Sequence, residues 1–182
     1  MVDNMGEYKK LLKQLADDNS DKFINNSSID HAAAIIEELF RRTNGVVRIL
    51  SDHLNPDVYA QAGVKEASVE FLKKDKSKLQ IIMQFKEKGR EGMSNNGFLS
   101  HLKGFKDKIT LFEASEELKK IKNHFMVSIT DKNSYALRYE TDIESHIATA
   151  TFNVGDPGQK LCEYFDSNVI SCEQISDEKW AN

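Results

Sequence analysis

Apolar positions along this chain follow a helical period first and then form an almost unbroken run. The helical period covers Ser28 to Gly45, where Ser28 can cap a helix and Asn44-Gly45 can end it. Its apolar face consists of Ile29, Ala32, Ala33, Ile36, Leu39 and Phe40. Residues 46–50 follow as a nearly continuous apolar run, which is typical of a strand buried on both faces. We therefore predict a helix followed by a central strand.

The same order repeats further along the chain. Asn55-Pro56 begins a predicted helix with inward residues up to Leu72, before a strand at 79–85. A short helix at 98–105 precedes a third strand at 108–112, and a Glu- and Lys-rich helical turn follows at 115–120. Helices that alternate with buried strands predict an α/β fold: a mixed β-sheet covered by helices on both faces.

A hairpin is predicted next, with strands at 124–130 and 135–140 joined by the turn residues 131–134. We expect it to supply central or adjacent strands of the sheet. An Ala-rich strand ending at Phe152-Asn153 and a closing helix with Leu161 and Phe165 come after it.

Alternation along the first hairpin strand places successive side chains on opposite faces. His124, Met126 and Ser128 share one face, and Phe125, Val127 and Ile129 share the other. We interpret the second face as the core and the first as an open surface.

The chain divides into a short preface and one main domain. Residues 1–22 form an amphipathic helix, with Tyr8, Leu11, Leu12 and Leu15 at helical spacing before a polar break at 17–21. This helix docks either on the domain or on a partner. Residues 23–182 form the domain, whose length and 40% hydrophobic content suffice for a sizeable core.

Charge gives mixed indications about partners. The net charge of −4 argues mildly against a dedicated nucleic-acid binder, since such domains usually carry a basic excess. Lysines nevertheless recur in clumps at 73–76, 86–88, 103–108 and 119–122. They form either a local basic rim at one end of the sheet or the solvated ends of helices. The Gly- and Asn-rich segment 86–97 is either a contact loop or a plain connection.

Several classes of protein are disfavoured by what the sequence lacks. There is no run of eighteen apolar residues, so we expect no membrane span, and the polar first ten residues favour a cytoplasmic protein. Cys162 and Cys172 read as reduced thiols outside any metal-site spacing. We also find no Gly-rich phosphate loop, no Ser-His-Asp signature and no H-E-x-x-H motif, so no metal and no cofactor are predicted.

Candidate chemistry lies in residues 124–131, HFMVSITD. His124 and Asp131 stand at the spacing H-x-K-x4-D, with Met126 where the lysine belongs. With the preceding helix and strand order, this segment resembles the phospholipase D-like superfamily, specifically its single-motif degenerate members, over about residues 28–170. In complete members of that superfamily the histidine attacks phosphorus and the lysine holds the phosphate oxygens. The Gly-Ser and Asn that usually follow the motif are absent, since Arg138-Tyr139 and Asp142 stand there.

The resemblance implies a function class and a mode of assembly. We expect a phospholipase D-like domain that is not catalytic and binds a phosphate-bearing ligand such as nucleic acid, or a protein partner, within a bacterial or viral defence system. The alternative is an active phosphodiesterase or nuclease that uses His124. Superfamily members with one motif per chain tend to pair, so the resemblance also implies a homodimer.

The candidate site residues surround the motif. Asp131 either supports His124 or is only a turn residue. Arg138 and Glu140 are cross-strand neighbours of His124, and the guanidinium of Arg138 could bind the phosphate that Met126 cannot. Three further residues at strand ends are assigned to ligand binding, two of them because residues just past strand ends line the cleft of α/β sheets: Asp52, His53 and Asn153.

Overall fold

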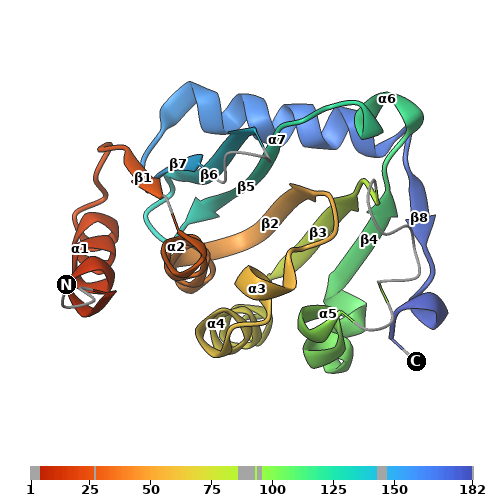
Figure 1. Cartoon of the computed structure of the whole chain (residues 1–182), viewed down its shortest axis with the longest axis horizontal. Coiled ribbons are helices and arrows are strands. Elements are labelled where there is room, and N and C mark those ends of the chain that lie inside the picture. The colour runs from red at the N-terminus through yellow and green to blue at the C-terminus, as the bar shows by residue number, and fades with distance from the viewer. Residues whose placement is uncertain (1–4, 27, 86–92, 94–95, 143–146, 182) are drawn as a thin grey trace.

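A computed structural model describes residues 5–26, 28–85, 93, 96–142 and 147–181, with the side chains of 141 and 142 excepted. It contains one mixed sheet of eight strands between two layers of helices (Figure 1). The strands are β1 (Ile24–Asn26), β2 (Thr43–Ser51), β3 (Lys78–Met83), β4 (Ile109–Glu113), β5 (His124–Thr130), β6 (Tyr135–Asp142), β7 (Ile147–Thr151) and β8 (Glu173–Ile175). The predicted α/β fold with a mixed, helix-covered sheet is confirmed.

Helices α2 to α5 cover one face of the sheet and α7 lies on the other (Figure 1). The α-helices are α1 (Met5–Asp17), α2 (Ile29–Arg42), α3 (Pro56–Tyr59), α4 (Ala62–Leu72), α5 (Gly97–Leu102), α6 (Glu116–Lys119) and α7 (Gly155–Val169). Short 3-10 helices follow at Lys103–Lys108 and Asp177–Lys179. The Ser28 side chain accepts a hydrogen bond from the His31 amide and so caps α2, as its position predicts.

The strand order is β1-β7-β6-β5-β2-β3-β4-β8. Strands β2, β3 and β4 are parallel, and each crossover between them carries helices, as parallel pairing requires. The predicted hairpin of β5 and β6 is antiparallel and joins the sheet beside β2. It therefore occupies a central position, because the residues of β5 pair with strands on both sides.

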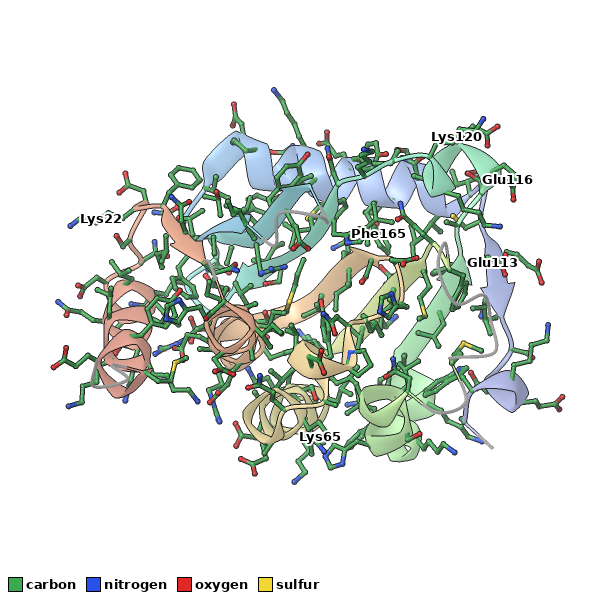
Figure 2. The ribbon with its side chains drawn as sticks, in the orientation of Figure 1. Lys22, Lys65, Glu113, Glu116, Lys120 and Phe165 are labelled. Atoms are coloured by element: carbon green, nitrogen blue, oxygen red, sulfur yellow. The ribbon has the colours of Figure 1, made fainter. Side chains whose placement is uncertain are left out.

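The two faces of the sheet carry separate cores. Met126 packs with α2 on one face, whereas Phe125 and Val127 pack on the other with Phe165, which extends from α7 toward the sheet (Figure 2). The alternation along β5 is as predicted, but our interpretation of the Met126 face as an open surface is wrong: Met126 is 2% exposed and Ile129 is 37% exposed. Polar residues at 124 and 128 hid the fact that this strand is covered on both sides.

Helix α1 docks on α2 of the same chain. Leu12 and Ala16 are buried between the two helices, and the Tyr8 ring stacks on the His31 ring with centroids 4.0 Å apart. Ion pairs at the helix surfaces join Lys9 to Glu37 and Asp17 to Arg42. Apolar burial is the main attraction here, since exposed ion pairs contribute little.

Three details of the chain differ from the sequence expectations or lie beyond them. The helix predicted from Asn55 to Leu72 is divided into α3 and α4 at residues 60–61. Strand β8 and the buried Trp180 that follows it were not predicted. Most of the segment 86–97, which we considered as a contact loop, lies outside the described residues.

Two further features, membrane-spanning helices and the state of the cysteines, can be stated for the described residues only. None of its helices combines the length and the apolar character needed to span a membrane. Cys162 and Cys172 are both free thiols.

Because Met126 is core, replacing it with a charged residue is expected to destabilise the fold. Met126→Lys should lower the free energy of unfolding by at least about 3 kcal/mol, since an ammonium without a partner is costly to bury. Ile129→Lys, on the same strand but exposed, is the control and should change stability by no more than about 0.5 kcal/mol. Urea unfolding measures both. Equal stability of the two variants would show that Met126 is not part of the core.

Candidate functional site

A cavity of about 390 Å³ opens at one edge of the sheet, where β2 and β6 end and β5 begins. The first turn of α2 and the helix α3 form its other walls. In α/β sheets the carboxyl ends of parallel strands are the usual location of ligand sites. Six chemically distinctive residues line it: Asp52, His53, Tyr59, His124, Arg138 and Glu140.

His124 is held by a fully buried glutamine. The Gln84 side-chain amide donates to the carbonyl oxygens of Leu118 at 2.7 Å and Ile121 at 3.0 Å. Its Oε1 therefore faces His124 Nε2, at 3.2 Å. A carbonyl oxygen can only accept, so Nε2 of His124 carries a proton and donates it to Gln84.

Glu140 and Arg138 lie on the same face as His124. In the hairpin His124 is opposite Glu140 and Met126 is opposite Arg138. Glu140 Oε2 lies 3.7 Å from His124 Nδ1, and Glu140 Oε1 lies 3.6 Å from Arg138. The carboxylate thus stands between two cationic or potentially cationic groups.

Arg138 reaches across β7 to a residue of β1. Its Nε donates to Asn26 Oδ1 at 3.2 Å. The neighbouring β7 positions are Ala148, opposite Glu140, and Ala150, opposite Arg138. Because alanine side chains are small, they leave room for the guanidinium to lie along the sheet. Arg138 is only 9% exposed, so its remaining N–H donors are presented within a sheltered site.

Burial and charge act in opposite directions on the acid of this site. Burial alone would raise the pKa of Glu140, but its contact with His124 and the charge of Arg138 outweigh burial, and the net pKa lies below its ordinary value. Glu140 is therefore ionised at neutral pH. Burial raises the pKa of Tyr59 to about 12, so the Tyr59 phenol stays neutral.

Asp52 and His53, which directly follow β2, line the same cavity. Asp52 Oδ2 lies 3.0 Å from His53 Nδ1, and Asp52 is buried. Five of the seven residues that the sequence analysis assigned to the site thus line one cavity: Asp52, His53, His124, Arg138 and Glu140.

Asp131 and Asn153 lie at the other end of the sheet. Asp131 follows the seven-residue strand β5, which places it roughly 20 Å from His124 at about 3.3 Å per residue. Asp131 lies in the turn of the hairpin, and its backbone amide donates to the carbonyl oxygen of Arg42 at the end of α2. Asn153 follows β7 and its side chain donates to Asn19 O. Neither residue is placed to support His124, and Glu140 lies beside the imidazole instead.

Three residues of the site were not found from the sequence: Gln84, Asn26 and Tyr59. A signal existed for Gln84, which is a polar residue directly after the buried strand β3, at its carboxyl end. Asn26 is distant in sequence from Arg138, and Tyr59 lies in the short helix α3; neither carried such a signal.

The lysine clumps do not form one rim around the cavity. Residues 73–76 and 103–108 precede β3 and β4, at the opposite edge from the cavity, where Lys74 and Lys108 donate to backbone carbonyl groups. Lys119 pairs with Glu113 and Glu116, which lie with Lys120 at the α6 corner (Figure 2). Of the clumps that the structure describes, two are thus far from the site and one is partly neutralised.

No metal centre is found in the described part of the chain. No group of three or more His, Cys, Asp or Glu side chains there is arranged to hold a metal ion. The side chains that line the cavity include a guanidinium, two imidazoles, a phenol and two carboxylates, together with amide and hydroxyl groups.

Comparison with known proteins gives likeness at the level of the fold. No protein-family model matches the chain, and no curated protein matches it either. Its structure is similar to that of TrmBL2, an archaeal chromatin protein with a novel mode of DNA binding, with a TM-score of 0.55 and 12% identity over 94% of this chain and 63% of that one. It also matches phosphatidylserine synthase of Haemophilus influenzae Rd KW20, with a TM-score of 0.46 and 8% identity over 88% of this chain and 40% of that one. The chain thus spans less than two thirds of either protein.

The lowered pKa of Glu140 predicts a pH-dependent contribution to stability. Its charge stabilises the fold above the ordinary pKa of 4.5, and this contribution is lost as pH falls through the lower pKa of the folded protein. Glu140→Gln should lower the free energy of unfolding by about 1–3 kcal/mol at pH 7. Below pH 4.5 the difference from the wild type should shrink. Urea unfolding at several pH values measures it, and a difference independent of pH would refute the ion-pair account.

Proposed function

We propose that this chain is a phospholipase D-like domain that binds a phosphate-bearing ligand in the sheet-edge cavity and does not cleave it. The observation that carries this proposal is the hydrogen bond from His124 Nε2 to Gln84 Oε1. A nitrogen that donates to a fixed carbonyl has no lone pair with which to attack phosphorus. His124 is thereby held in the wall of the site, with its Nε2 proton bonded to Gln84.

The donors of the cavity suit a phosphate group. Arg138 offers a planar guanidinium, which binds phosphate oxygens by paired hydrogen bonds. The amino end of α2, at Ser28 and Ile29, faces the same space and adds a partial positive charge. Met126 provides none of the charge that a catalytic lysine would give, and it is buried in the core.

Nucleic acid is the first ligand class to test. TrmBL2, whose fold is similar, binds DNA, and we use that likeness only as an analogy for choosing a probe. Binding of a protein partner, homodimer formation and a place in a bacterial or viral defence system stay predictions from the sequence resemblance. One chain already places His53 and His124 in one cavity, so a second copy is not needed to supply two histidines.

An active phosphodiesterase is the second candidate function. Glu140 at 3.7 Å from His124 Nδ1 favours it, because an acid beside one ring nitrogen is how many enzymes orient a catalytic histidine. For attack, however, Nε2 would have to leave Gln84 and lose its proton. The binding function therefore keeps the hydrogen bond between His124 and Gln84, whereas the phosphodiesterase would have to break it.

Replacing Arg138 is expected to weaken ligand binding specifically. Arg138→Gln should raise the dissociation constant for a labelled 5′-phosphorylated single-stranded oligonucleotide about tenfold or more, the value of one charge-assisted hydrogen bond. Fluorescence anisotropy measures it. Arg48→Gln is the matched control, because Arg48 lies in the same sheet but pairs with Asp166 of α7. Equal losses in both variants would indicate only a general charge effect and contradict the proposal.

Cleavage of a phosphodiester is expected to be absent. The protein should hydrolyse bis-p-nitrophenyl phosphate no faster than its His124→Ala variant, since the loss of one electrostatic donor alone costs about a hundred- to a thousandfold. Release of p-nitrophenol is followed by absorbance. Turnover that is abolished by His124→Ala and kept in His101→Ala, at an exposed histidine, would favour the phosphodiesterase.

A further inference from the structure

The two histidines of the cavity hold their protons on different ring nitrogens. His53 Nδ1 lies 3.0 Å from Asp52 Oδ2. With the Asp52 carboxylate as the acceptor of this contact, Nδ1 carries the proton. In the neutral ring Nε2 of His53 is then an acceptor, and it has no hydrogen-bond partner among the described residues. His124 is the opposite, with Nε2 as donor. His53 thus offers the cavity an accepting nitrogen, whereas the Nε2 proton of His124 is already bonded to Gln84.

The segment that carries His53 is held in an unfavourable backbone conformation. Leu54, with φ of 54°, and Phe85, with φ of 53°, both lie in the left-handed region that bulky residues avoid. The Asn96 side chain donates to His53 O at 3.2 Å, and the Phe85 amide donates to Asp52 O at 3.0 Å. Backbone strain of this kind persists only where the surrounding structure enforces it, and it concentrates at ligand sites.

The size of the cavity limits what it can hold. At about 390 Å³ it is at the lower end of the range of small-molecule sites, roughly 300–1,000 Å³. It has room for one nucleotide, with Ile29 and Val58 as apolar walls for the sugar or base. The lysine clumps at 73–76 and 103–108 lie at the other edge of the sheet. They therefore do not continue the cavity as a basic surface along a bound nucleic-acid strand.

The terminal phosphate of a nucleic-acid strand can carry a proton near neutral pH, whereas an internal phosphate cannot. A phosphate monoester titrates with a pKa of about 6, so near neutral pH it can share a proton with an accepting nitrogen. An internal phosphodiester has no such proton and carries one negative charge. A neutral His53 therefore improves binding of a monoester and offers a diester nothing.

We infer that the cavity binds the terminal phosphate monoester of a nucleotide or nucleic-acid strand, with Arg138 on the phosphate oxygens and His53 Nε2 sharing its proton. This inference rests on the proposed phosphate-binding function and adds the ligand class. Asp52 acts through His53 as a positioning residue. The charged and titratable groups that share the cavity with His53 are Asp52, Tyr59, His124, Arg138 and Glu140.

The test compares a 5′-phosphorylated single-stranded tetranucleotide, the same strand without the phosphate, and free 5′-AMP by isothermal titration calorimetry. The wild type should bind the phosphorylated strand about tenfold more tightly than the unphosphorylated one, the value of one charge-assisted hydrogen bond. 5′-AMP should compete with that strand, because the cavity takes one nucleotide. His53→Leu should lose the preference, whereas His101→Leu, at an exposed histidine, should keep it.

A second readout uses only the wild-type protein, so it does not depend on how the variants fold. Titrations in two buffers of different ionisation enthalpy at pH 7 should show net proton uptake with the phosphorylated strand and none with the unphosphorylated one. Equal affinity for both strands, or a preference that persists in His53→Leu, would overturn the role of His53. Failure of 5′-AMP to compete would overturn the single-nucleotide ligand. If neither strand bound, the proposed function itself would fail.

Discussion

The side-chain amide of Gln84 is the constraint on which the chemistry of the cavity depends. Its two N–H donors are taken by the carbonyl oxygens of Leu118 and Ile121, so its oxygen has only one direction left, toward His124. That bond fixes the proton on Nε2 and turns Nδ1 toward Glu140. Because Gln84 is fully buried, breaking these bonds would leave polar groups unsatisfied, which costs about 1–3 kcal/mol each.

The rest of the site follows from the two-sided burial of the sheet. A central strand covered on both faces has no open surface in its middle, so its polar side chains can reach a ligand only at the sheet edge. His124, at the first position of β5, is placed there, and Met126, two residues further on, is in the core. Arg138 reaches the same space only because Ala148 and Ala150 leave the neighbouring strand uncrowded.

The sequence allowed the fold and much of the site to be predicted, because both depend on the short repeats with which side chains return to one face of a helix or strand. Helical and strand periods indicated the α/β sheet, and the period of two placed His124, Arg138 and Glu140 on one face of a hairpin. Of the two alternatives for Asp131, the turn residue agrees with the structure, since a seven-residue strand carries its two ends far apart.

Contacts between distant segments were not predictable in this way. Asn26 and Arg138 are 112 residues apart, and Gln84 and His124 are 40 apart. No local period connects such residues. The cover of Met126 by α2 belongs to the same class, because the polar residues at 124 and 128 made that face look exposed.

Nitrogen-15 NMR of the histidine rings, at neutral pH in the wild-type protein, distinguishes the binding site from a catalytic one. It reports which ring nitrogen of His124 carries the proton, and so whether Nε2 is bonded to Gln84 or is free to act as a nucleophile. We expect a proton on Nε2, bonded to Gln84, before and after addition of a phosphate monoester. A ring protonated only on Nδ1, with Nε2 free, would contradict it.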